Sequence, residues 1–295
     1  METGFGRFHP AAALLYFVSV LTVTMVIMNP VLLIISCAAA VLNIAYFGGI
    51  NAVFHYLKLT FFTSVMIIVI NPLISHKGIT ILLYLPDGNP LTLESVIFGI
   101  AAAVMMSCIF AWFYTINRVF TSDKIICLFG NFMPKIALLI SMTLNFAEKF
   151  IIKLRDVRAV QSTIGIDTAK GSLMKRLKNS VTIFSIMIQW AMESSVDTAD
   201  SMKSRGYGLK KRTSYTVYRI FPRDIIMLVF ILICDALILT AFRSGAVNYS
   251  YYPSFSFGIQ IINIAVYFIF AALCLMPLLI NIREDGKWKY IRSNI

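Results

Sequence analysis

Charge is scarce in this 295-residue sequence, and acidic charge is the scarcest. Only 14% of the residues are Asp, Glu, Lys or Arg, whereas soluble domains carry about 25%. Apolar residues make up 59% of the chain, and the mean hydropathy is +0.80. This composition excludes an ordinary soluble domain and predicts an all-α, polytopic membrane protein.

The common signatures of catalysis are also missing. The sequence has no HExxH, no GxSxG and no phosphate-binding loop of the Gly-x4-Gly-Lys-Ser/Thr type. Its five cysteines form no CxxC pair that would suggest a zinc site. Asp197-x-x-Asp200 is similar to one motif of membrane prenyltransferases, but the second aspartate-rich motif is absent, so that enzyme class is disfavoured. We therefore expect no enzyme activity, no bound metal and no cofactor.

Apolar runs that could cross a bilayer occur six times. Because an α-helix rises 1.5 Å per residue, about 20 apolar residues span the hydrocarbon core. The first run shows no cleavage site of a signal peptide, and we expect it to be retained. A polar loop at 48–58 and a turn-rich loop at 76–94 separate some of the runs. The six expected spans are residues 11–28, 31–47, 59–75, 95–116, 225–242 and 257–280.

The positive charge is concentrated between the fourth and fifth spans. Residues 117–224 contain 18 of the 26 Lys and Arg residues. Because Lys and Arg gather in cytoplasmic loops, we predict that this segment and both termini are cytoplasmic. The formal net charge of +12 is then a signal of topology, and nucleic-acid binding is not expected. The predicted domains are 1–116 with four spans, 117–224 as a cytoplasmic segment, and 225–295 with two spans and a basic tail.

Two similar units lie within the cytoplasmic segment. Each has a 12-residue apolar run, then a Glu, then a charged half, and then a glycine. The first run is 136–147, after Pro134, and the second is 181–192. Both runs are too short to span a membrane, and glycine commonly ends a helix. We predict two long helices, with a short basic piece at 174–178 before the second.

The charged half of the second helix has an acidic face. Glu193, Asp197 and Asp200 are spaced i, i+4 and i+7, which places them on one side of the helix. The first helix offers Lys149 and Lys153. The two helices could cross and pair through these charges, or the acidic face could meet a basic partner, and both alternatives stay open.

One further acid lies inside an expected span. Asp235 is near the middle of residues 225–242. An ionisable residue within a membrane is a functional candidate by default, because burying its charge in hydrocarbon is costly. A pairing with a neighbouring helix is the alternative.

The end of the second helix resembles a known family. Residues 199–208, with Ser204-Arg205-Gly206 at their centre, are similar to the second Ala-Arg-Gly coupling motif of the energy-coupling factor (ECF) transporter transmembrane component, the T component. The family carries this motif twice. The first copy falls at 159–165 and ends in Thr163-Ile164-Gly165, where Ile164 replaces the arginine of the family. The layout resembles the family over most of the chain.

This resemblance implies a coupling subunit of an importer. It implies that two cytoplasmic ATPase subunits bind ATP and each hold the end of one long helix. It also implies a small membrane subunit, the S component, that binds a vitamin or a metal ion and rests on the apolar runs. The location would be a prokaryotic plasma membrane, with the lipid bilayer around the spans. A conventional ABC permease subunit, which uses a single coupling loop, and a secondary transporter remain alternatives.

Overall fold

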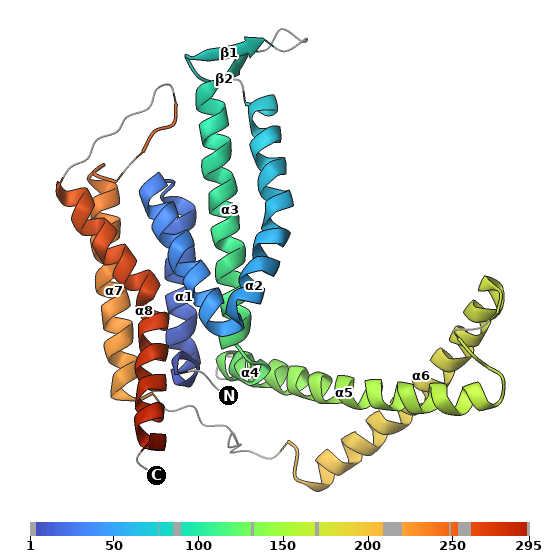
Figure 1. Cartoon of the computed structure of the whole chain (residues 1–295). Coiled ribbons are helices and arrows are strands. Elements are labelled where there is room, and N and C mark those ends of the chain that lie inside the picture. Colours follow the sequence, from blue (N-terminus) through green and yellow to red (C-terminus); the bar gives the residue numbers. More distant parts are fainter. Residues whose placement is uncertain are drawn as a thin grey trace. The chain divides into compact units, whose positions relative to one another are not determined.

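In the part of the chain that the structure describes, the regular secondary structure is helical apart from one short hairpin (Figure 1). The computed structural model describes residues 4–75, 77–84, 90–130, 133–168, 171–208, 220–247, 249–252 and 261–293. The chain divides into two compact units, residues 1–124 with 218–295 and residues 125–217. The expected all-α class is confirmed, and the functional division at 117 and 224 stays a prediction.

Five long apolar helices form the first unit. Four of them, α2, α3, α7 and α8, are long and apolar enough to cross a membrane, and α1 is a shorter apolar helix. These five helices carry the six expected spans, so the polytopic membrane class is confirmed. Their bounds are α1 Pro10–Val26, α2 Pro30–Ile74, α3 Leu93–Val119, α7 Pro222–Arg243 and α8 Ile261–Ser293, with a 3-10 turn η1 at Phe5–Arg7.

The expected loop at 48–58 is wrong. Helix α2 contains both the second and the third span, and its only non-helical residue is Gly49, at φ 72°, a backbone conformation that glycine adopts readily. Residues 50–58 are helical. Their polar side chains Asn51, His55 and Lys58 are spaced i, i+4 and i+7 and lie exposed on one helix face. Residues 50–58 therefore begin the second of two helices that meet at a kink at Gly49, and the connection between the second and the third span is reduced to that kink.

Two other expectations are corrected. The loop at 76–94 contains an antiparallel hairpin of β1 (Ile81–Tyr84) and β2 (Pro90–Thr92), with Ile81 opposite Thr92. The turn-rich run within that loop falls largely at 85–89, outside the described residues. The basic tail is not separate from the last span, because α8 continues to Ser293.

Aromatic side chains fill the core of the first unit. Phe5 from η1, Tyr16 and Phe17 from α1 and Trp112 from α3 pack edge to face, with ring centroids 5.1 to 6.3 Å apart. The Tyr16 hydroxyl donates to the Leu273 carbonyl oxygen at 3.1 Å, and all these rings are buried. The N-terminal segment thus ties α1 to α3 and α8.

A buried carboxylate joins the starts of α1 and α7. Asp224 is 1% exposed, and its oxygens accept the backbone N–H groups of Phe221 at 2.8 Å and His9 at 3.2 Å. The His9 ring accepts the N–H of Ala11, which caps α1. Both helix starts therefore gain partners for N–H groups that a helix leaves unpaired.

Two long helices dominate the second unit, and α4 (Ser122–Gly130) crosses the boundary between the units. Helix α5 runs from Pro134 to Thr163, and its predicted start at proline is confirmed. Helix α6 runs from Leu173 to Ser204. It begins earlier than expected, because the basic piece at 174–178 is its first turn and not a separate element.

The two helices cross, which is one of the two alternatives that the sequence left open (Figure 1). Aromatic rings pack between them, with Phe146 stacked on Trp190 at 5.6 Å and Phe150 at 6.3 Å from the same ring. On α6, Ile183 and Met187 are buried. The connection is held as well, because Arg176 and Asn179 of α6 donate to the carbonyl oxygens of Thr168 and Asp167.

Candidate functional site

The end of α6 is a Schellman motif. Arg205 is the last residue before Gly206, whose φ of +80° favours glycine. The Gly206 N–H donates to the Lys203 carbonyl oxygen at 3.0 Å, and the Tyr207 N–H donates to that of Met202 at 3.0 Å. These two bonds satisfy carbonyl groups that the helix end would leave free. Arg205 itself is exposed.

The end of α5 repeats the same bonds. Gly165 has a φ of +86°, and its N–H donates to the Ser162 carbonyl oxygen at 3.2 Å. The Ile166 N–H donates to that of Gln161 at 3.0 Å. Ile164 therefore occupies the same position in its motif as Arg205 occupies in the other, and its side chain is 69% exposed.

The hydroxyl residues before these positions also match. The Thr163 hydroxyl donates to the Val160 carbonyl oxygen at 2.7 Å, and the Ser204 hydroxyl donates to that of Ser201 at 2.8 Å. Both hydroxyl groups are bonded back to their own helix. The residue that follows, Ile164 or Arg205, is exposed in both cases. The two helix ends point in different directions in Figure 1.

An apolar groove lies between α5 and α6. It has a volume of about 720 Å³. Its walls come from the apolar run of α5 and from both halves of α6, and they include Leu139, Met142, Phe146, Ile188, Met192 and Met202. The predicted apolar runs thus line one surface together.

The acidic face of α6 lies away from this groove. Glu193, Asp197 and Asp200 are exposed and do not line it, whereas Lys149 of α5 does. Among the described residues of α5 and α6, no ion pair joins Lys149 or Lys153 to these carboxylates. The pairing of the two helices through these charges therefore finds no support in the described contacts, and a basic partner for the acidic face stays a prediction.

Asp235 has a partner in the first unit. The Ser19 hydroxyl of α1 donates to its Oδ1 at 2.5 Å. The two residues lie in a crevice of about 300 Å³ between α1 and α7, with the Thr22 hydroxyl on the same wall. Ser19 is therefore the residue of a neighbouring helix that pairs with Asp235. In the part of the chain that the structure describes, no group of three or more His, Cys, Asp or Glu could hold a metal ion.

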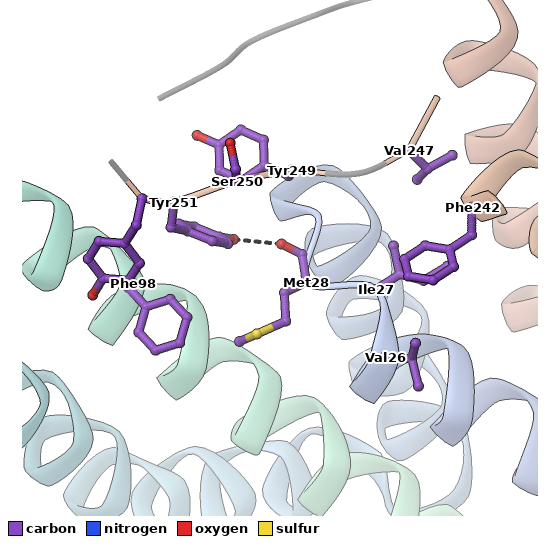
Figure 2. Close-up of a pocket in the computed structure, with 10 residues that line it drawn as sticks. Val26, Ile27, Met28, Phe98, Phe242, Val247, Tyr249, Ser250 and Tyr251 are labelled. Atoms are coloured by element: carbon purple, nitrogen blue, oxygen red, sulfur yellow. Dashed lines mark hydrogen bonds between the residues drawn. The ribbon is translucent and has the colours of Figure 1, made fainter. Parts of the chain in front are cut away.

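A second pocket adjoins this crevice and was not expected from the sequence. Figure 2 shows Tyr251 donating to the Met28 carbonyl oxygen, at 2.8 Å, beside Phe98 of α3. The pocket has a volume of about 370 Å³, and it shares Val26, Ile27 and Phe242 with the α1–α7 crevice. The closely spaced tyrosines at 249, 251 and 252 were the available signal.

Comparisons with known proteins give partial matches. No family model matches the chain. It is 31% identical over 108 residues to the energy-coupling factor transporter transmembrane protein EcfT of Lactobacillus helveticus, covering 36% of this chain and 39% of that protein. The EcfT of Bacillus selenitireducens is 29% identical over 113 residues, covering 38% and 42%. An uncharacterized protein of Mycoplasma genitalium is 25% identical over 135 residues, covering 45% of this chain and 31% of that protein.

Both named relatives with about 30% identity are EcfT proteins. The aligned region spans about two fifths of the length of the two EcfT proteins. With the apolar helices, the similarity to these transporter proteins supports a multi-pass membrane protein. The resemblance that Ser204-Arg205-Gly206 predicted is confirmed: this chain is similar to the transmembrane T component of ECF transporters.

Proposed function

We propose that this chain couples ATP hydrolysis to the uptake of a micronutrient as the T subunit of an ECF-type importer. Two cytoplasmic ATPase subunits bind ATP, and each holds the end of one long helix, α5 or α6. A small membrane S component binds the vitamin or metal ion. The chain itself binds no ATP and carries no cofactor.

One observation carries this proposal. Two crossing helices end in the same Schellman motif, with Ile164 and Arg205 at equivalent positions. A conventional permease subunit would need only one coupling loop, whereas two matched ends suit two ATPase subunits that are copies or close relatives of each other. The similarity to EcfT proteins supports the same assignment.

Arg205 is the proposed ionic contact. Its exposed guanidinium has five donors in a planar fork, which suits a carboxylate on the ATPase surface. Ile164 offers an apolar side chain at the other end. The two ATPase contacts are therefore unequal, one with a charge pair and one without.

The apolar groove is the proposed platform for the S component. Its walls carry apolar side chains from both helices, so a change in their crossing angle would be transmitted directly to a subunit resting there. The concentration of Lys and Arg at 117–224 supports a cytoplasmic position for these helices and for both termini.

Charge reversal at Arg205 tests the proposal. Arg205→Glu places a carboxylate against an acidic site, and losing a buried interfacial charge pair costs about 2–5 kcal/mol. We expect the variant to lose co-purification with the ATPase subunits, or to hydrolyse ATP without substrate uptake. Co-expression with ATPase and S subunits, followed by affinity purification and uptake assays in proteoliposomes, measures both.

Lys135→Glu is the charge-reversal control, because Lys135 is an exposed cation in the first turn of α5 and lies outside both helix-end motifs. The control variant should keep complex formation with the ATPase subunits and substrate uptake near the parent level. Monodisperse elution of the Arg205→Glu chain in detergent would show that it still inserts and folds. Parent-level binding and uptake by that variant would make the assignment wrong.

A further inference from the structure

We propose that the first two turns of α6, from Leu173 to Ser180, lie in the surface of an anionic membrane and anchor the helix there. This segment precedes the apolar run that forms the proposed platform. The proposal concerns a lipid contact of the chain alone, and it does not depend on an ATPase or an S component.

An apolar stripe along one side of the helix supports this contact. Leu173, Met174, Leu177 and Val181 are each between 63% and 77% exposed. Leu173, Leu177 and Val181 are spaced four residues apart, so with Met174 they share one face of α6. Phe184 continues this face and is 63% exposed. So many large apolar side chains on one unpartnered face are typical of a helix that lies in the interface of a bilayer.

Arg176 and Lys178 flank the stripe, and Lys175 lies on the far side of the helix, near Thr182. Lys175, Arg176 and Lys178 lie within the same two turns and are exposed. Arg176 donates through Nε to the Thr168 carbonyl oxygen at 2.9 Å, which orients it toward the connection with α5. The segment from Leu173 to Ser180 has no acidic residue. An apolar stripe with basic flanks matches a leaflet of anionic lipids, which attracts each Lys or Arg near its surface.

The charge pattern separates this segment from the platform. The run 181–192 continues the apolar face without a single Lys or Arg, and part of it lines the groove shared with α5. A protein surface suits that neutral part. The preceding turns combine three cations with the stripe. An anionic lipid surface can both attract the cations and bury the apolar side chains.

Fluorescence quenching in nanodiscs tests the inference. A fluorescent amino acid replaces Leu177 in the full chain, which is reconstituted in phosphatidylcholine alone or with phosphatidylglycerol added. Lipids with a spin label near the headgroup quench a probe that lies in the interface. We expect several-fold stronger quenching in the anionic discs, and Lys175→Glu with Lys178→Glu should remove the difference.

The same probe at Thr182, an exposed residue on the opposite side of the helix, should stay weakly quenched. Lys203→Glu is the matched charge control and should leave the quenching at position 177 unchanged. A probe at Leu173 gives an independent reading if the first variant does not fold. Weak quenching at both 173 and 177, equal quenching in the two lipid compositions, or equal quenching at 177 and 182 would each overturn the inference.

Discussion

The ends of α5 and α6 share a backbone and differ in one side chain. Both have a glycine at positive φ, the same pair of capping bonds and a hydroxyl bonded back to its helix. At the position between hydroxyl and glycine, one helix has Ile164 and the other Arg205. The shape of a contact site can thus be kept while its charge is lost.

This difference separates two roles of the motif. The glycine and the capping bonds fix where the helix stops and which residue lies outermost. In the proposed function, the outermost side chain then sets the kind of ATPase contact, ionic for Arg205 and apolar for Ile164. Changes at the glycines should affect both ends alike, and changes at Ile164 and Arg205 should affect each end differently.

The largest effect after reversal of Arg205 should come from a charge at Ile164. Ile164→Glu sets a carboxylate against the ATPase surface that we propose to be acidic, and such like-charge contacts cost several kcal/mol, or roughly 100-fold in affinity. Ile164→Arg should be tolerated, because it restores the side chain present at the other end. Titration of each variant with purified ATPase subunit measures both. An equal loss of ATPase affinity in the two variants would show that the apolar shape of Ile164, and not the sign of an added charge, determines the contact.

A smaller effect should follow from alanine at the glycines. Gly165 and Gly206 have left-handed backbones, which cost other residues about 1–2 kcal/mol. Gly165→Ala and Gly206→Ala should therefore fray the helix ends by similar amounts in hydrogen exchange. Gly206→Asn is the control, because asparagine tolerates this conformation. Fraying confined to one helix would break the structural equivalence.

The smallest effect should come from the acidic face. The carboxylate of Asp197 is exposed and forms no ion pair with Lys153 in the described part of α5 and α6. A double-mutant cycle of Asp197→Lys and Lys153→Glu on thermal stability should give a coupling energy under about 0.3 kcal/mol, below that of most surface pairs. A larger coupling would restore the internal-pairing alternative.

Much of the architecture follows from the sequence, because apolar run length and proline or glycine positions reflect local physics. Pro134 opens α5, and glycines stop both long helices. Polar residues alone predict a loop at 48–58, but their spacing of i, i+4 and i+7 fits one face of a helix. Charge at 174–178 likewise predicts a break before α6, although these residues are compatible with a helix that begins at Leu173.

The role of the site residues stays a prediction from the sequence, and the geometry of the helix ends comes from the structure. The equivalence of Ile164 and Arg205 follows from aligning two short motifs, and the structure adds the capping bonds that make them alike. The partner of Asp235 could not be predicted, since Ser19 lies 216 positions away. The same holds for Asp224, whose carboxylate accepts the N–H of His9 across 215 positions. Such contacts depend on helix packing, which local patterns do not encode.

The bonded connection between α5 and α6 has a mechanical consequence. Thr168 and Asp167, just past the end of α5, are held through their carbonyl oxygens by Arg176 and Asn179 on α6. A flexible connection would let the end of α5 shift while α6 stayed in place. With these two bonds in place, a pull on the Ile164 end acts directly on the start of α6. In the proposed function, α5 and the start of α6 then move together, and motion at one end is not taken up by stretching of the connection.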